Sequence, residues 1–344
     1  MEEKQIAGKV LVARGDAYKM ERRVVGSENN YIVEKPRNKS KIHAEGRAFM
    51  QNLPLTLLAL PGIIMIFIFN YIPLYGLILP FKNYRFDLGF FKSSWAGFDN
   101  FKFLFNGEAI LNATRNTILY NFVFIFLGTC IAVILALMLF ELSRKSVKIY
   151  QTIIFLPYFV SWVVVAFVAN AFLNMDYGAI NKIGGLFGME PILWYNEPKY
   201  WPVILVIASI WKGMGYNAVI YYAALMGVDR SYYEAAKIDG AGKLAQMRYI
   251  SIPMIKPIIT ILVILGIGRI FYGDFGLFYS VTLNSSLLYS TTDVIDTFVY
   301  RSLINLGDIG MASAAGFFQS VVGFILVVTT NYVIKKIDSE NALF

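Results

Sequence analysis

The sequence predicts an all-α membrane protein that crosses the bilayer six times. Hydrophobic residues make up 57% and charged residues only 16% of its 344 residues. The mean hydropathy is +0.55, which lies outside the usual range of soluble domains. Several apolar stretches reach the roughly 20 residues that a helix needs to cross a bilayer. Because lipid offers no partner to exposed backbone groups, these stretches are expected to be helical.

Six stretches meet this length, and polar links separate them along most of the chain. We expect helical spans at about 55–80, 116–140, 151–173, 202–226, 255–280 and 311–334. Together they form a transmembrane domain over 51–335. The segment 1–50 has too little apolar content to build a core and is expected to be a basic cytoplasmic tail. Residues 336–344 are expected to be a short second tail.

Lys and Arg residues gather on one side of the predicted spans. Eleven of them precede the first span. More lie between the second and third spans, in the link 227–254, and after the sixth span, whereas the opposite links balance their basic residues with acids. The positive-inside rule therefore predicts that both termini and the link 227–254 are cytoplasmic. This topology and attraction to anionic lipid explain the net charge of +8, because the chain has no basic domain of foldable size for nucleic acid.

The predicted cytoplasmic link contains a short segment whose residues suit docking to another protein rather than chemistry. Ser231 and Glu234 have the spacing of a capping box that opens a helix. Gly240 can close that helix in the left-handed conformation. Ala235 and Ala236 would leave one side of the helix nearly flat, so that a partner can approach closely. The carboxylates of the segment would offer fixed charges to this partner.

The full pattern is Glu-Ala-Ala, three residues, Gly, and a hydrophobic-Pro pair about a dozen residues further on. It resembles the cytoplasmic coupling loop of ABC-importer permeases, in which this helix sits in a groove of the ATPase subunit. The residues that carry the resemblance are Glu234, Ala235, Ala236, Asp239, Gly240, Ala241 and Pro253. The family usually has Ile-Pro before the helix, where this chain has Val228 and Asp229. An aspartate can still favour a helix start through its side chain and charge.

The resemblance extends over nearly all of the chain after about residue 50. The chain resembles MetI-like permeases of the maltose-transporter class of carbohydrate importers. Within this class, segments 272–279, 291–297 and 340–344 most resemble the branch for oligo- and polysaccharide uptake. The resemblance implies a type I ABC importer in a bacterial cell membrane that moves oligosaccharides by alternating access. A second related permease, an ATPase dimer and an extracellular solute-binding protein would be its partners. The ATPase would bind ATP and Mg, so this chain would be a transport subunit without a cofactor or enzyme activity.

Three other functions remain open on the sequence. An ABC importer permease for a non-sugar solute, such as a peptide, would carry the same coupling motif. A gradient-driven secondary transporter would need no ATPase. A membrane-embedded enzyme would need a catalytic cluster, but His43 is the only histidine and Cys130 the only cysteine. This excludes a His-based metal site, a His-based triad and a disulfide framework, and we expect no catalytic or metal site.

Polar and aromatic residues inside the predicted spans are candidates for a substrate path. A charged side chain near mid-bilayer costs ~2.5–3.5 kcal/mol and should face protein or water. Sugars stack on aromatic rings, and amides can satisfy their hydroxyls, although an interfacial aromatic belt is the alternative explanation for the rings. The candidates are Trp162, Asn170, Trp211, Lys212, Tyr216, Asn217, Arg269, Tyr272, Asp274 and Gln319.

Two further interpretations of the charged candidates are open. Arg269 and Asp274 could simply neutralise each other, although a spacing of five residues is poor for a same-face helical pair. Alternatively, Lys212 and Arg269 could favour acidic oligosaccharides, such as those that contain uronate.

Two other segments have undecided roles. The small residues at 311–316 would suit helix–helix contact, either within this chain or with a second permease. The polar external link 289–297 could contact a solute-binding protein or could be a solvated loop.

Overall fold

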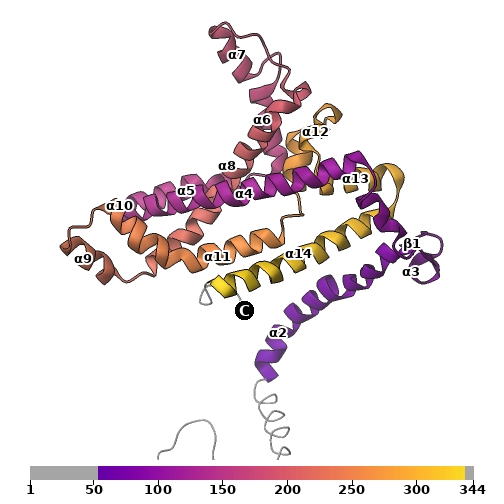
Figure 1. Ribbon diagram of the computed structural model, residues 1–344, viewed down its shortest axis with the longest axis horizontal. Coiled ribbons are helices and arrows are strands. Elements are labelled where there is room, and N and C mark those ends of the chain that lie inside the picture. The colour runs from indigo at the N-terminus through magenta and orange to yellow at the C-terminus, as the bar shows by residue number, and fades with distance from the viewer. Residues whose placement is uncertain (1–52, 338–344) are drawn as a thin grey trace, which may run out of the picture. The chain divides into compact units, whose positions relative to one another are not determined.

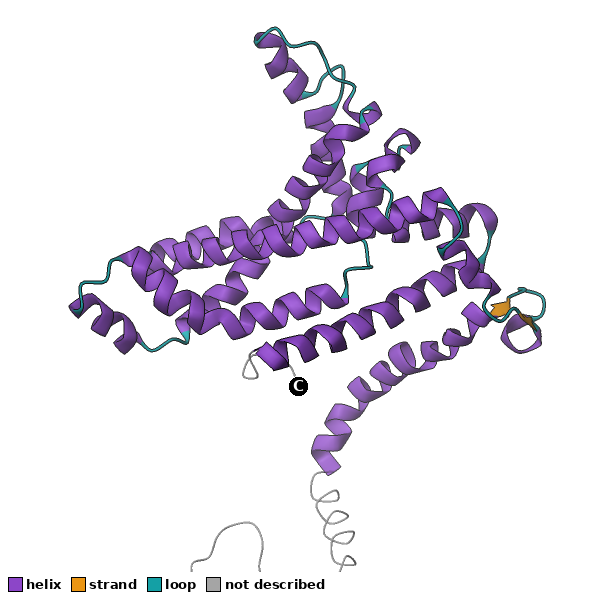
Figure 2. Ribbon diagram, viewed as in Figure 1, coloured by secondary structure: helices purple, strands orange, loops and turns teal. Residues whose placement is uncertain are grey.

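The computed structural model describes residues 53–337 of the chain. These residues are almost all helical, with one small pair of strands (Figure 2). They divide into two units between Leu74 and Tyr75. The expected tail 1–50 and residues 338–344 lie outside the described residues.

The first unit contains α2 (Leu53–Ile66), the π-helix η1 (Phe67–Tyr71) and the start of the 3-10 helix η2 (Ile72–Phe81). The three helices follow one another without a break. Neither α2 nor η1 has a buried residue. Their sequence is apolar all round, which suits a helix that crosses a membrane.

Four long helices form the body of the second unit. They are α4 (Glu108–Glu141), α8 (Trp201–Met226), α11 (Ile252–Gly268) and α14 (Ile309–Ile337). Helix α4 packs against α8, and α11 packs against both α4 and α14 (Figure 1). Two buried clusters hold α4, α8 and α11 together. One contains Trp201, Leu205 and Phe278, and the other contains Ala136 and Leu225.

Short elements fill the links between the long helices. Those outside the link that joins α8 to α11 include β1 (Lys82–Asn83), α3 (Gly89–Lys92), β2 (Ser94–Trp95), η3 (Asp99–Leu104), α7 (Ala179–Leu186), η4 (Trp194–Asn196), η5 (Pro198–Tyr200), η8 (Ser286–Leu288), α12 (Tyr289–Thr292) and α13 (Ile295–Leu306). Strands β1 and β2 are antiparallel. The buried ammonium of Lys82 donates to the carbonyl oxygens of Phe90 (2.7 Å) and Ser93 (3.2 Å), so the hairpin satisfies this charge internally.

Among the described residues, five helices are long and apolar enough to cross a membrane. They are Leu53–Phe81, Glu108–Glu141, Pro198–Met226, Lys243–Gly268 and Ile309–Lys336. The expected six spans result when a bent helix pair counts as one further span. The second span starts at Glu108 rather than near 116, because its polar first turns find partners in the protein. Asn112, for example, donates to the carbonyl oxygen of Ser290 (2.9 Å).

The third span, expected as one helix over 151–173, is wrong in this form. It consists of α5 (Arg144–Phe159) and α6 (Trp162–Leu173), which are bent by 96° at the break between them. Pro157 lies in the last turn of α5, and Ser161 accepts a hydrogen bond from the backbone N–H of Val164 (3.4 Å) as the N-cap of α6. A proline followed by a new cap ends one helix and begins another.

The fifth span, expected over 255–280, is also wrong at its far end. Helix α11 ends at Gly268, and the chain leaves the helical conformation before the π-helix η7 (Gly276–Val281) begins. Glycines at 266, 268, 273 and 276 make a continuous helix unfavourable in free energy here. Hydropathy does not measure helix propensity, so it predicted a longer helix.

Close helix contacts depend on small residues within the second unit. A side chain at Gly268 would meet Val327, and one at Gly323 would meet the backbone of Gly268, so α11 and α14 approach closely at this pair. Ala314 and Ala315 are buried. The small-residue segment 311–316 therefore packs, at least through these two alanines, inside this chain.

Substitution of Gly215 should destabilise the contact between α5 and α8. A Cβ at this position would collide with the backbone of Ile154 and Phe155, whereas a Cβ at Gly213 on the same helix would meet open space. We expect Gly215→Ala to cost about 1–3 kcal/mol through overpacking and to lower the Tm of the purified protein in detergent. The control Gly213→Ala should leave the Tm unchanged or raise it, and equal Tm values for the two variants would contradict the expectation.

Candidate functional site

The first candidate site is the link that joins α8 to α11. It contains α9 (Arg230–Ile238), α10 (Lys243–Gln246) and the π-helix η6 (Met247–Ser251). These elements lie at the end of the second unit where α4 ends and α11 begins (Figure 1). Pro253 lies in the first turn of α11, where its missing N–H needs no partner.

The start of α9 differs from the expected capping box. Asp229, not Ser231, is the N-cap, and its carboxylate accepts a hydrogen bond from the backbone N–H of Ser231 (2.9 Å). The expected box was wrong by two residues, because an aspartate directly before the helix offers the stronger acceptor to the unpaired N–H groups of the first turn. The backbone hydrogen bond from Ser231 lowers the pKa of the exposed Asp229 carboxyl below its ordinary value.

The end of α9 confirms the prediction for Gly240. Its φ is +82°, in the left-handed region. The N–H of Gly240 donates to the carbonyl oxygen of Lys237 (3.2 Å), and the N–H of Ala241 donates to that of Ala236 (2.8 Å). This pair of bonds is a Schellman motif. Helix α9 is therefore closed at both ends by its own residues.

One face of α9 is turned outward. Glu234, Ala235 and Asp239, which were expected to meet a partner, are exposed, whereas Ala236 and Ala241 are partly buried. The expected docking surface did not include its apolar part. Ile238 is 87% exposed and Leu244 is 81% exposed. Apolar residues inside an otherwise polar, charged link were the signal that could have revealed them.

The second candidate site surrounds the break between α5 and α6. Lys212, near the middle of α8, donates from its Nζ to the carbonyl oxygens of Tyr158 (2.7 Å) and Val160 (2.6 Å) at the end of α5. The same ammonium lies 5.6 Å from the ring centre of Tyr158 and 5.3 Å from that of Trp162. A cation at a helix C-terminus and over aromatic faces is favourable.

Asp274 joins the break after α11 to this cluster. Its carboxylate accepts a hydrogen bond from the indole N–H of Trp162 (2.8 Å) and another from the backbone N–H of Leu277 (3.3 Å). Among the described residues, no ion pair joins Asp274 to Arg269. The interpretation that these two charges neutralise each other is therefore wrong, since the carboxylate turns toward α6 after the chain leaves the helix.

Four of the ten path candidates lie in this cluster: Trp162, Lys212, Tyr216 and Asp274. The ring of Tyr216 stacks on that of Tyr158, with a centroid distance of 4.7 Å and an interplanar angle of 13°. Sequence reasoning missed Tyr158. Its position after Pro157 and shortly before the N-cap Ser161 marked a helix break, where a side chain leaves the regular helical surface.

The other six candidates do not join the cluster. Tyr272 pairs with the hydroxyl of Ser320 (2.8 Å), and Asn170 donates to the hydroxyl of Tyr177 (3.2 Å). Gln319 is buried, and its amide donates to the carbonyl oxygen of Phe271 (2.7 Å). Trp211 and Arg269 are exposed, and Asn217 is partly buried.

Asp296, in α13, is a second carboxylate that the sequence analysis missed. It accepts hydrogen bonds from the backbone N–H of Gly273 (2.6 Å) and from the amide of Gln319 (3.2 Å). Burial raises the pKa of the Asp296 carboxyl above its ordinary value, and the two hydrogen bonds oppose this shift. It holds the chain just after the end of α11.

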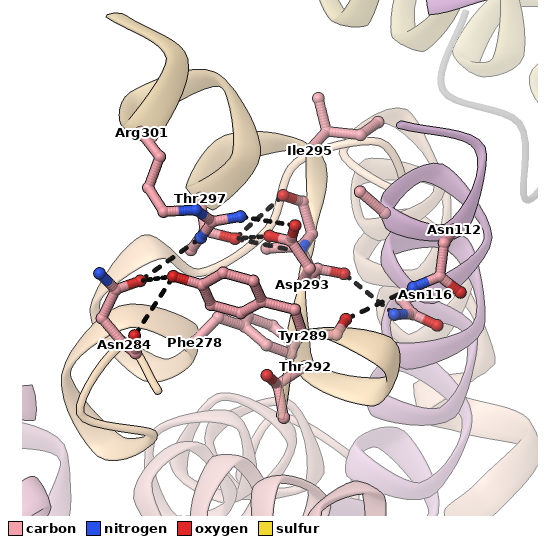
Figure 3. Close-up of polar contacts among 12 residues, drawn as sticks. Asn112, Asn116, Phe278, Asn284, Tyr289, Thr292, Asp293, Ile295, Thr297 and Arg301 are labelled. Carbon is pink, nitrogen blue, oxygen red and sulfur yellow. Dashed lines mark hydrogen bonds and ion pairs between the residues drawn. The ribbon is translucent and has the colours of Figure 1, made fainter. Parts of the chain in front are cut away.

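The external link 289–297 is not a solvated loop. Figure 3 shows Asp293 facing Arg301, with which it forms an ion pair (2.5 Å). The backbone of Asp293 also accepts from the amide of Asn116 (3.0 Å), and the N–H of Ile295 donates to the hydroxyl of Thr117 (2.9 Å). Asp293 and Ile295 are buried. The polar residues of this link pair with one another and with α4, which explains why polarity alone suggested solvent exposure.

Comparison with known proteins identifies the family of the chain. A family model described as "Binding-protein-dependent transport system inner membrane component" matches residues 109–339. The match covers more than half of the chain, and the chain belongs to this family.

Individual relatives extend the similarity over most of the chain. Protein LplB of Bacillus subtilis (strain 168) is 38% identical over 288 residues, which cover 83% of this chain and 90% of LplB. The polygalacturonan/rhamnogalacturonan transport system permease protein YteP of the same strain is 33% identical, with coverages of 85% and 90%.

A solved structure is similar over the same range. The crystal structure of a bacterial ABC transporter involved in the import of the acidic polysaccharide alginate contains a chain with a TM-score of 0.77 and 30% identity. The match covers 86% of this chain and 99% of that chain. These similarities confirm the resemblance to MetI-like permeases of carbohydrate ABC importers and the all-α membrane fold.

Loss of the Asp229 cap should loosen the start of α9. We expect Asp229→Ala to speed hydrogen exchange at the backbone amides of the first turn, whereas Asp229→Ser, which keeps a capping oxygen, should protect them almost as well. Because the folded-state pKa of Asp229 is lowered, the cap is fully effective above the ordinary aspartate pKa of about 3.9. It is lost as the pH falls through the lowered value. Unchanged exchange in Asp229→Ala would refute the capping role.

Proposed function

We propose that this chain is the permease subunit of an ATP-driven importer that moves oligosaccharides into the cytoplasm by alternating access. The observation that carries the proposal is α9, a short helix that is capped at both ends and exposes Glu234 and Ala235 at the end of the membrane helices. Such a helix is a rigid body that a second protein can grip. The family to which the chain belongs supports the same role.

The partners follow from this role. A second related permease would complete the path, and a dimer of ATP-binding cassette ATPases would bind α9. The ATPases would hold ATP and Mg, so hydrolysis would not occur in this chain. An extracellular solute-binding protein would deliver the sugar; one of the alginate transporter structures is in complex with an alginate pentasaccharide-bound periplasmic protein. The chain would lie in the bacterial cell membrane with both termini in the cytoplasm, as its Lys and Arg distribution favours.

The cluster at the helix breaks is our candidate for the sugar path. Broken helices line the substrate sites of many transporters because their backbone groups are available there. The stacked rings of Tyr158 and Tyr216 and the indole of Trp162 would offer surfaces for the apolar faces of sugars. Lys212 has three N–H donors and uses two of them on carbonyl oxygens, which leaves one for a ligand. The other path candidates that the sequence predicts would contact the sugar elsewhere along its path.

Purification of the complex tests the function. The wild-type chain, isolated from its native membrane in mild detergent, should bring down a second permease and an ATPase, with sugar-dependent ATP hydrolysis. Glu234→Lys and Gly240→Val should insert normally but abolish uptake, since one reverses a charge on the exposed face and the other forces a β-branched residue into a positive φ. Gly242→Ala, at an ordinary φ of −70° with open space around it, is the matched control.

Two results would contradict the function. A homomer without ATPase would favour a gradient-driven carrier, and normal sugar-dependent hydrolysis with Glu234→Lys would remove α9 as the coupling element. If the complex transported peptides and not sugars, the proposed mechanism would stand and the proposed substrate class would be wrong.

Acidic oligosaccharides are the cargo class that the basic groups favour. Arg269 is exposed where the chain leaves α11, and no ion pair or hydrogen bond to its guanidinium is found among the described residues. We expect Arg269→Gln to raise the KM for a uronate-containing oligosaccharide about tenfold, as the loss of one charged hydrogen bond implies. A neutral oligosaccharide of equal length is the control and should be unaffected. Equal transport of both sugars by the wild type, with no effect of Arg269→Gln, would disprove the preference.

A further inference from the structure

Helix α9 touches the membrane helices through one narrow face. Tyr233 and Ala236 are its only partly buried residues, and every other residue from Arg230 to Ile238 is exposed. Its backbone ends are satisfied by Asp229 and by the Schellman motif at Gly240. The helix therefore needs little support from the spans to keep its shape. Of the two residues on the inner face, only Tyr233 is large.

Tyr233 reaches two spans at once. Its ring packs against that of Phe140, in the last turn of α4, with a centroid distance of 5.4 Å. Its hydroxyl lies 3.0 Å from the hydroxyl oxygen of Ser251, at hydrogen-bond distance. Ser251 is buried, with 1% exposure, and directly precedes α11. One side chain thus joins α9 to the end of α4 and to the start of α11.

Other routes from α9 to the spans are weaker. A cavity of about 350 Å³ lies between α9 and the helix ends, and its lining includes Tyr233, Glu234 and Lys237 of α9 together with Phe140 of α4. The neighbouring α10 is linked to α4 by an ion pair between Lys243 and Glu141 (2.5 Å). The Lys243 side chain is 69% exposed, and exposed ion pairs contribute little.

We propose that Tyr233 is the positioning residue that transmits movement of α9 to α4 and α11, with its hydroxyl bond to Ser251 as the link to α11. This inference rests on the proposed function, because it assigns the route by which a partner's movement reaches the spans. Coupling between distant parts of a protein travels through packed side chains and hydrogen bonds of this kind. Apart from Tyr233, only the small Ala236 of α9 is partly buried, so little packed surface remains when the link is removed.

The test compares uptake per ATP hydrolysed in the reconstituted complex. Tyr233→Phe keeps the ring contact with Phe140 and removes only the hydroxyl, and Ser251→Ala removes its partner. We expect each variant to lower uptake per ATP about fivefold, the effect of one neutral hydrogen bond. The double variant should be no worse than either single one, because both remove the same interaction. Tyr150→Phe, at an exposed tyrosine of α5 outside this link, is the control and should couple normally.

The outcomes separate the inference from the function on which it rests. Wild-type uptake per ATP in Tyr233→Phe, or additive losses in the double variant, would overturn the inference. So would a proportional fall of uptake and hydrolysis, since a merely structural role lowers the amount of working complex without changing their ratio. If Tyr233→Phe did not assemble, Ser251→Ala alone would decide in the same way. A wild-type preparation without any ATPase would instead overturn the proposed function.

Discussion

The architecture of the second unit depends on how backbone groups are satisfied where its spans break. The last carbonyl groups of α5 have no helical partner, and within a membrane water is not available to replace one. The ammonium of Lys212 supplies two hydrogen bonds, to Tyr158 and Val160. A charge that is costly in a bilayer therefore serves as the cap of a broken helix, and the sharp bend between α5 and α6 becomes a stable feature of the fold.

The second break is tied to the first. Trp162, at the start of α6, donates to Asp274, which in turn accepts from the backbone N–H of Leu277 in η7. A Cβ at Gly276 would collide with the indole of Trp162, so only a glycine lets η7 approach this closely. Each break thus supplies a partner for the other, and the polar groups that satisfy them gather in one place. The position of the candidate path follows from the backbone, because irregular chain at membrane depth needs such groups around it.

The sequence predicted the features that depend on neighbouring residues along the chain. It did not predict the features that depend on contacts between distant segments. The left-handed Gly240 and the exposed Glu234 follow from the sequence of one short helix. Hydropathy found the spans but not the break at Ser161 or the end of α11 at Gly268, because a window of about 20 residues stays apolar on average across both breaks. The burial of Asp293 could not be predicted from the sequence either, because it depends on contacts between segments. Its partner Arg301 and the amide groups of α4 are side chains whose proximity only the fold creates.

Helix α11 runs from one candidate site toward the other. Its 17 residues span about 25 Å at the helical rise of 1.5 Å per residue. The end near Ser251 is in contact with Tyr233 of α9, and beyond the other end Gly273 is held by the partly buried carboxylate of Asp296. A helix transmits displacement along its axis because its backbone bonds resist compression, whereas the glycine-rich segment beyond Gly268 can change its dihedral angles at low cost. Movement applied at α9 would therefore reach the breaks and would be absorbed where the chain is most deformable, beside Asp274 and Trp162.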